Sequence, residues 1–397
     1  MMSVWSSLVG QEAAVAKLSE AAASARAIVA SRGGAHASDD ARSMSHAWLI
    51  TGPPGSGRSV AARAFAAALQ CTGETVGCGQ CAGCRTTMGR TNADVVFAAT
   101  ETSIINVETA RSLVLQAQSS PSQGLWRVIV VEDADRLGES GANALLKAIE
   151  EPPEHTVWLL CAPSPEDMIA TIRSRCRHLG LRIPTASAVA DLLVREGVAT
   201  PDVALEAARA AQSHIGLARA LARDPQMRER RRAIITAPAS VRSVGEAVMA
   251  ADRLLETAKA QADAQVSERN AREKAELLRQ LGMDEGESAT KASRTMIRQL
   301  EEDQKRRSKR ALTDAIDRAL IDLLAIYRDV LMIQVGGDGE LINTDLADLV
   351  GQIARDSTPR QTLARVDHIE TARKRLVSNG NPLLVLEDMA ISLRPQA

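Results

Sequence analysis

The chain has 397 residues, enough for two or three domains, and its 48 basic and 49 acidic residues give a net charge of −1. Because the charges balance, they give no indication of a nucleic-acid or membrane partner. No apolar run approaches the ~20 residues of a membrane-spanning helix, and the start lacks the basic-then-apolar order of a signal peptide.

The first half of the chain predicts a parallel sheet. An Ala-rich helix is predicted over 3–30, starting near Ser7 or Gly10, and a Gly/Ser-rich flexible loop over 31–45. Short apolar strands then alternate with helices: strands at 46–51, 94–99, 127–133 and 156–162, helices at 58–70, 106–120 and 140–150. Strands separated by helices indicate a parallel sheet with helices on both faces.

After residue 185 only helices are predicted. Two of them, 184–197 and 201–223, each begin near a proline and indicate an all-α lid over 186–223. An all-α region over 224–397 follows. Within it the charged stretch 262–310 predicts a long solvent-exposed helix with a mobile break at 282–290, and a partner-binding arm is the alternative. The stretch 311–335 predicts an apolar packing face.

The stretch TGPPGSGRS, residues 51–59, nearly matches the phosphate-binding pattern G-x-x-x-x-G-K-[ST] between a strand and a helix. Gly52, Gly55 and Gly57 allow the backbone to wrap an anion, and Ser59 is placed to hold Mg²⁺. Arg58 replaces the usual lysine, and its larger planar fork can hold a phosphate but fits the transition state poorly. We expect ATP binding here to be weak and hydrolysis to be absent.

A predicted apolar strand ends in Glu132 and Asp133. In a phosphate-loop enzyme, acidic residues at this position hold Mg²⁺ and polarise water. The usual order is Asp then Glu, so the two side-chain lengths are exchanged here. The alternative is an acidic strand end that caps the next helix.

Four of the six cysteines lie within residues 71–84, in the spacing C-x6-C-x2-C-x2-C. Four thiolates so close together suit tetrahedral Zn²⁺, and the intervening glycines let the chain turn back on itself. Since four protein ligands leave no position for water, the predicted zinc is structural. A disulfide or a reactive thiol is the alternative. The predicted ligands are Cys71, Cys78, Cys81 and Cys84.

Several motifs together resemble one family. NALLKAIEEPPEHTVWLL, residues 143–160, followed by IRSRC, residues 172–176, closely resembles the bacterial clamp-loader subunits of the AAA+ class that serve DNA polymerase III. VGQE, residues 9–12, resembles their nucleotide-base-facing start, and the cysteine insert is similar to theirs. The resemblance implies a P-loop-type AAA+ module over 1–185 with a zinc module at 71–84, and, from the ending 379–393, a collar domain over 224–397 for oligomerisation.

The motor subunits of that family, gamma/tau, have a loop lysine, an Asp-Glu pair and a Thr-bearing sensor. This chain departs at all three, with Arg58, with Glu132-Asp133, and with Ala162-Pro163 after the next strand. These departures resemble the delta-prime type, a stator whose own site does not turn over. An active gamma/tau-like ATPase with variant motifs is the alternative.

The motif Ser174-Arg175-Cys176 is intact. The resemblance implies that Arg175 is an arginine finger that acts in trans on the ATP of a neighbouring subunit, where such a group is worth roughly 10³–10⁵ in rate. The alternative is an arginine that caps a helix C-terminus. Arg173 shares this role or pairs locally, and the register of the lid residue Arg219 against the family's lid arginine is left open.

The resemblance also implies partner proteins and a location in the cell. They are the motor (gamma/tau) and delta subunits, with the sliding clamp and primer–template DNA reached through the complex. The place is the cytoplasm, at the replisome on the nucleoid. A third interpretation, the zinc module as a nucleic-acid-binding element, has only Arg85 nearby and no aromatic residue to support it.

Overall fold

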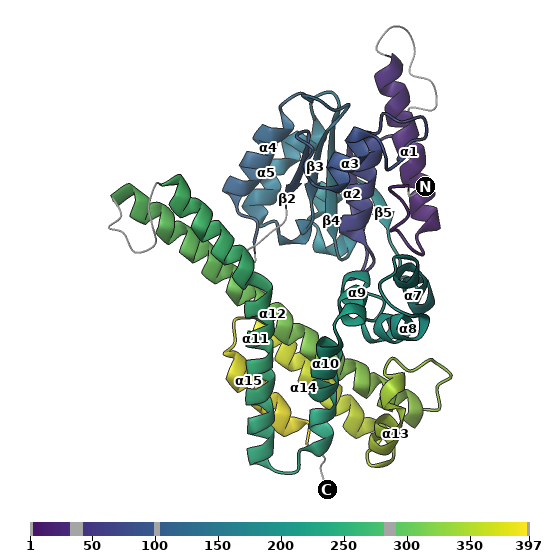
Figure 1. Cartoon of the computed structure of the whole chain (residues 1–397), viewed down its shortest axis with the longest axis vertical. Helices are drawn as coiled ribbons and strands as arrows, with labels where there is room; N and C mark the ends of the chain where they lie inside the picture. Colours follow the sequence, from purple (N-terminus) through teal and green to yellow (C-terminus); the bar gives the residue numbers. More distant parts are fainter. Residues whose placement is uncertain (1–2, 32–42, 99–103, 282–290, 395–397) are drawn as a thin grey trace. The chain divides into compact units, whose positions relative to one another are not determined.

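The protein forms two compact units, Met1–Ala222 and Arg223–Ala397, in a computed structural model that describes residues 3–31, 43–98, 104–281 and 291–394 (Figure 1). Most of the predicted loop 31–45 and the break at 282–290 lie outside these residues. In the described part of the chain, no helix has both the length and the apolar character needed to cross a membrane.

The first unit contains the predicted parallel sheet. Its strands are β1 (Ala47–Thr51), β2 (Val95–Ala98), β3 (Arg127–Val131), β4 (Thr156–Ala162) and β5 (Arg177–Gly180). All pairs are parallel, in the order β2-β3-β4-β1-β5. The four predicted strands are confirmed. The fifth was not predicted because β5 is a short edge strand with one buried residue, so it lacks an apolar run.

Helices cover both faces of this sheet (Figure 1). Alternate side chains of β1 show the division: Trp48 and Ile50 pack with one set of helices, and Leu49 packs with the other. The first set is α1 (Glu12–Ala30), α2 (Arg58–Leu69) and α3 (Ala82–Met88), and the second is α4 (Val107–Ala117), α5 (Glu139–Glu150) and α6 (Ala170–Arg173). Two short 3-10 turns, η3 (Ala134–Arg136) and η4 (Pro165–Asp167), follow β3 and β4.

Helix α1 begins at Glu12, so the predicted start near Gly10 is close, whereas the predicted extension of this helix to residue 3 is wrong. Gly10 has φ +68°, a left-handed conformation that interrupts a helix. The residues before it form turns instead, and the Val4 amide donates a hydrogen bond to the Gly77 carbonyl at 3.0 Å. The N-terminal segment is thereby attached to the cysteine-rich module.

Three helices complete the first unit: α7 (Ala186–Arg195), α8 (Pro201–Ala210) and α9 (Ile215–Arg223). The predicted single helix over 201–223 is therefore two helices. Gln212 and Ser213 have φ of +48° and +62°, and the Ser213 amide returns to the Ala208 carbonyl at 2.9 Å. These left-handed residues end α8 and redirect the chain into α9.

The second unit is all-helical. Its elements are α10 (Pro225–Ser240), α11 (Val244–Gln280), α12 (Lys291–Gln334), η5 (Thr344–Leu346), α13 (Ala347–Arg355), α14 (Pro359–Val377) and α15 (Pro382–Ser392). The predicted packing face over 311–335 is confirmed, because Ile316, Leu320, Ile326 and Val330 are fully buried in its core.

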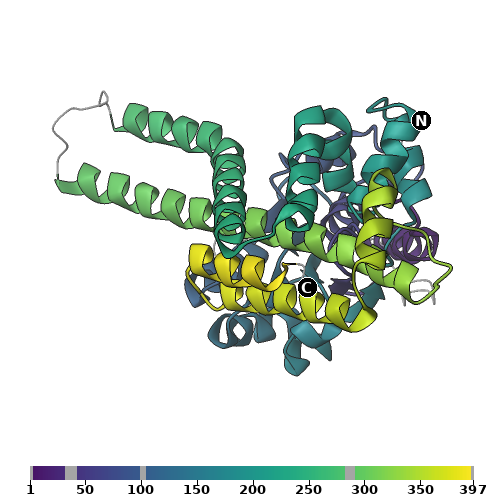
Figure 2. The ribbon, with the colours of Figure 1, turned by 90° about the horizontal axis from the view of Figure 1, so that it is seen from below.

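The charged stretch 262–310 forms the outer halves of α11 and α12, which run side by side away from the rest of this unit (Figure 1, Figure 2). A long helix with a break at 282–290 was expected, and the structure has two helices, of which the first ends at Gln280 and the second begins at Lys291. The apolar core ends at Val266 and Ala311. Beyond them the two helices make polar contacts, with Arg307 bonded to Asn270 and Glu273 at 2.8 Å each.

Candidate functional site

The predicted nucleotide residues meet at the carboxyl edge of the sheet. The loop 51–59 follows β1, Glu132 and Asp133 follow β3, and Ala162 and Pro163 lie at the end of β4. Because β3, β4 and β1 are neighbours, their carboxyl ends bring these segments together. Ligands of open α/β sheets bind at this edge.

The loop keeps a backbone shape that only glycine supports. Gly55 and Gly57 have φ of +89° and +91°. A Cβ on Gly52 would lie 2.5 Å from Ser56 Oγ, and the Gly52 amide donates to the Pro163 carbonyl at 3.1 Å. The anion-wrapping form of the loop is therefore present although its lysine is absent.

Two segments outside the loop hold it in place. The buried Gln11 amide donates to the carbonyls of Ser56, at 3.3 Å, and Arg182, at 2.5 Å. A Cβ on Gly55 would lie 2.8 Å from the Cα of His214, the residue before α9. Gln11 belongs to the VGQE motif, which the resemblance assigns to the nucleotide base; here its side chain anchors the phosphate loop.

Several donors around the loop suit a phosphate group. Ser56 Oγ and Arg58 Nη1 are buried and have no hydrogen-bond partner within the described ranges, and the same holds for Arg63 Nε on the following turn of α2. Buried donors without partners are costly. An anion in the loop would satisfy such groups, so the residues present fit a phosphate.

The acidic pair Glu132-Asp133 suits Mg²⁺ less well than the loop suits a phosphate. Glu132 forms an ion pair with Arg90, with Nη2 and Oε1 2.5 Å apart. Arg90 also lies over the ring of Phe97, 5.0 Å from its centroid, and has φ +59°. The carboxylate that would polarise water is thus engaged by a guanidinium of the same chain.

Burial and neighbouring charges shift several pKa values at this edge of the sheet. Burial lowers the pKa of Arg63, the charge of Arg90 lowers it further, and Glu132 opposes this shift. Burial raises the pKa of Asp135, with a further contribution from Asp133. Burial also raises the pKa of Cys161 to about 12, so this thiol is not a nucleophile at neutral pH.

Two further positions that the resemblance marks as candidates carry groups that do not suit catalysis. Ala162 and Pro163 carry no side chain that could hydrogen-bond a γ-phosphate. In the lid, Arg219 is bonded to both carboxylate oxygens of Glu196, at 2.9 and 3.0 Å. This arginine is therefore committed to an ion pair within the lid.

Arg175 is near the C-terminus of α6 and remains 37% exposed. Its Nε donates to Glu150, and its Nη1 donates to the Thr171 carbonyl at 2.7 Å and to Ser174 Oγ at 3.3 Å. Arg173 donates to the Pro165 carbonyl at 3.4 Å, a local contact. An exposed, tethered guanidinium can meet an anion on another molecule.

The four clustered cysteines converge as predicted. Their sulfur atoms all lie within 4.8 Å of one another, and those of Cys71 and Cys81 are 3.9 Å apart. Zn–S bonds of about 2.3 Å in a tetrahedron give sulfur–sulfur distances of about 3.8 Å. The amides of Cys81 and Cys84 donate to the sulfurs of Cys78 and Cys81 at 3.4 Å each. The donor set and its size fit zinc.

Close backbone contacts fix this module on the sheet domain. A Cβ on Gly83 would lie 2.0 Å from the Gln70 carbonyl oxygen at the end of α2. Arg26 of α1 donates to the Cys71 carbonyl at 2.9 Å. Burial acts to raise the pKa of Cys81, but hydrogen bonds from Cys84 and Thr72 outweigh it and lower this pKa to about 6.

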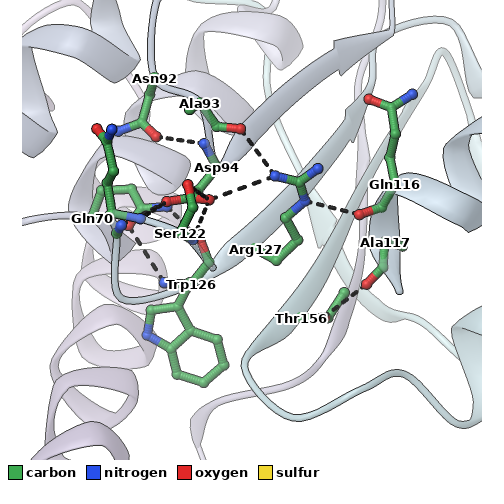
Figure 3. Close-up of polar contacts among 12 residues, drawn as sticks. Gln70, Asn92, Ala93, Asp94, Gln116, Ala117, Ser122, Trp126, Arg127 and Thr156 are labelled. Atoms are coloured by element: carbon green, nitrogen blue, oxygen red, sulfur yellow. Dashed lines mark hydrogen bonds and ion pairs between the residues drawn. The ribbon is translucent and has the colours of Figure 1, made fainter. Parts of the chain in front are cut away.

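A buried carboxylate ties the segment after the module to β3 (Figure 3). Asp94 accepts hydrogen bonds from the amides of Ser122, Gln123 and Gly124 at 2.6–2.8 Å and lies 3.6 Å from Arg127 Nη1. These bonds shape the turn that leads into β3, the strand that Glu132 follows.

Sequence reasoning missed the partners Arg90, Glu150, His214 and Asp94. Each is remote in sequence from the residue that it contacts, so no local pattern could have identified it. The nearest signal was the Glu150-Glu151 pair within the family-like stretch 143–160.

Comparison with known proteins identifies the relatives of the first unit. Residues 36–185 match the family model described as DNA polymerase III, delta subunit. The gamma/tau subunit of DNA polymerase III from Mycobacterium tuberculosis is 35% identical over 170 residues, 41% of this chain and 29% of the relative. The delta' subunit from Escherichia coli K12 is 34% identical over 180 residues, 44% of this chain and 54% of the relative.

Part of the first unit is therefore similar in sequence to DNA polymerase III subunits. The matched region spans about half or less of the length of these relatives. Among solved structures, a gamma subunit-related protein from Thermotoga maritima aligns over 87% of this chain and 93% of its own, with 16% identity and a TM-score of 0.37. The DNA clamp loader delta protein of Bacillus subtilis aligns over 89% and 96%, with 12% identity and a TM-score of 0.28.

Proposed function

We propose that this chain is a delta-prime-type subunit of a DNA polymerase III clamp loader that does not hydrolyse ATP itself. The observation that carries the proposal is the ion pair between Glu132 and Arg90, because it engages the acid that an active site needs for Mg²⁺ and water. Arg58 and the Ala162-Pro163 pair support it. The homology to delta' and gamma/tau subunits gives the class of complex.

In this proposal the phosphate loop is a binding or architectural element. Its backbone amides and Arg58 would hold phosphate groups without the acid and sensor required for turnover. Arg175 would act on ATP held by the adjacent subunit, where it stabilises the charge that develops on the transferred phosphoryl group. Zinc, held by the four cysteines, would fix the fold of residues 71–84.

The proposed partners are the motor (gamma/tau) and delta subunits. Together they would open the sliding clamp and load it on primed DNA at the replisome. The helical second unit would supply the collar through which the subunits assemble.

A gamma/tau-like ATPase is the second candidate, favoured by the 35% identity to a gamma/tau subunit and by the intact loop geometry. ATP hydrolysis by the purified chain, alone and with a motor subunit, distinguishes the two. We expect phosphate release only with the motor subunit. Arg58→Lys alone should not create activity, because Glu132 stays paired with Arg90. Turnover of roughly 1 s⁻¹ by the chain alone, abolished by Ser59→Ala, would establish the ATPase instead.

A further inference from the structure

The contact between Glu150 and Arg175 joins two segments that are 25 residues apart. Glu150 is the last residue of α5, and Arg175 lies two residues beyond the end of α6. Both side chains are exposed to a similar degree, 41% and 37%. The pair therefore lies at the surface, where an ion pair adds little to stability.

The geometry of this pair leaves one end of the arginine available. Glu150 accepts from Nε, and the Thr171 carbonyl and Ser174 hydroxyl accept from Nη1. Within the described part of the chain, Nη2 has no hydrogen-bond partner. A guanidinium is a planar fork, so bonds at Nε and Nη1 fix the orientation of the whole group. Its remaining donors can therefore bind an anion without any of these bonds being broken.

We propose that Glu150 is a positioning residue that holds Arg175 ready for the γ-phosphate on the adjacent subunit. This inference rests on the proposed function, because it assigns a role to Glu150 only if Arg175 acts in trans. A long side chain that is already oriented loses less conformational freedom when it binds, and a reacting group that is correctly placed reacts faster.

The opposite role for Glu150 would be to mask the finger. A carboxylate that covered the terminal nitrogens would compete with phosphate, and its removal would raise activity. The observed bond is instead to Nε. The two roles therefore predict changes of opposite sign on removal of the Glu150 charge.

The test uses a clamp-loader complex reconstituted with motor subunits, clamp and primed DNA. Four forms of this chain are compared with wild type: Arg175→Ala, Glu150→Gln, the double variant, and Glu151→Gln as a control on the adjacent exposed carboxylate. ATPase kcat and KM are measured for each complex, and gel filtration checks that it is intact. Thermal melting checks that each variant chain is folded.

Arg175→Ala is expected to remove the share of kcat that comes from the ATP site on the subunit adjacent to this chain. Glu150→Gln should remove most of that same share, with the KM for ATP unchanged. In the Arg175→Ala background it should have no further effect, because there is no finger left to position. Glu151→Gln should match wild type.

Three results would overturn the inference. If Arg175→Ala lowers kcat but Glu150→Gln leaves it unchanged or raises it, Glu150 has no positioning role while the proposed function stands. A double variant slower than Arg175→Ala alone would show that Glu150 acts through the fold. If Arg175→Ala itself has no effect in an intact complex, both the finger and its positioning residue are refuted.

Discussion

Single side chains decide what the carboxyl edge of the sheet can do. The loop glycines and Arg58 have a geometry that fits an anion, but the neighbouring acid Glu132 is paired with Arg90, 42 residues away in the chain. At a site of this kind, substitution of the loop residue alone changes little, because the acid remains engaged. The chemistry is set by side-chain contacts rather than by the motif.

Asp94 provides a test of buried charge at this scale. Burial acts to raise the pKa of its carboxyl, but hydrogen bonds from Ser122, Gln123 and Gly124 outweigh it and lower the pKa. A lowered folded-state pKa means that stability is present above the unfolded value of about 3.9 and is lost as the pH falls through the folded value. Asp94→Asn should destabilise the first unit by roughly 3 kcal/mol at pH 7.

Urea unfolding, monitored by Trp fluorescence, checks this prediction, because all four Trp residues lie in the first unit. The difference between wild type and Asp94→Asn should shrink as the pH falls below about 4. Asp191→Asn, a change to an exposed carboxyl on α7, should have little effect. Equal stability of Asp94→Asn and wild type at pH 7 would contradict the account.

At the scale of elements, two local structures stand out because neither has an apolar core of its own. The cysteine module consists of a turn and the short helix α3, held by sulfur atoms and close backbone contacts. The outer hairpin of α11 and α12 is held by polar contacts beyond Val266. A bound metal would stabilise the cysteine module. The outer hairpin depends on the apolar core that ends at Val266 and Ala311.

The cysteine module should bind one Zn²⁺ per chain. Cys81→Ser should abolish stoichiometric binding and lower the melting temperature reported by Trp fluorescence, because zinc binding supplies folding free energy to such modules. Metal content measured by elemental mass spectrometry checks this. Cys176→Ser, a cysteine outside the cluster, should retain the metal. A folded wild-type protein without metal would refute the site.

The outer hairpin should be dispensable for folding. Replacing residues 268–307 by a short Gly/Ser turn removes no residue of the apolar core, so we expect the unfolding free energy of the second unit to change by less than about 1 kcal/mol. Val266→Asp, which buries a charge, should cost several-fold more. Circular dichroism melts compare the two variants. Aggregation of the shortened chain would show that the hairpin contributes to folding.

On the scale of the whole molecule, the chain has separate cores. The sheet and its helices bury one set of side chains, and α10–α15 bury another. A unit with its own core can fold alone. In the proposed function, this division would separate the nucleotide-type module from the assembly module.

We therefore expect residues 1–222 and 223–397 to fold when they are expressed separately. Each fragment should melt cooperatively, with Trp fluorescence reporting the first and Tyr327, the only tyrosine, reporting the second. Cys81→Ser should shift only the first transition in the full chain. Failure of the second fragment to fold would show that its core depends on the first unit.

The sequence by itself determined the alternation of strands and helices, the phosphate loop and the cysteine cluster, because these depend on local apolar runs, glycines and short spacings. It could not determine contacts between remote residues. The ion pair of Glu132 with Arg90, the bond of Arg175 to Glu150, and the side-by-side packing of the two helices within 262–310 all depend on how the chain returns on itself. Local patterns encode backbone preference, whereas the partners of an exposed or half-buried charge are chosen by packing. Only the tertiary structure could therefore show that Glu132 is paired with Arg90 and that Arg175 is bonded to Glu150.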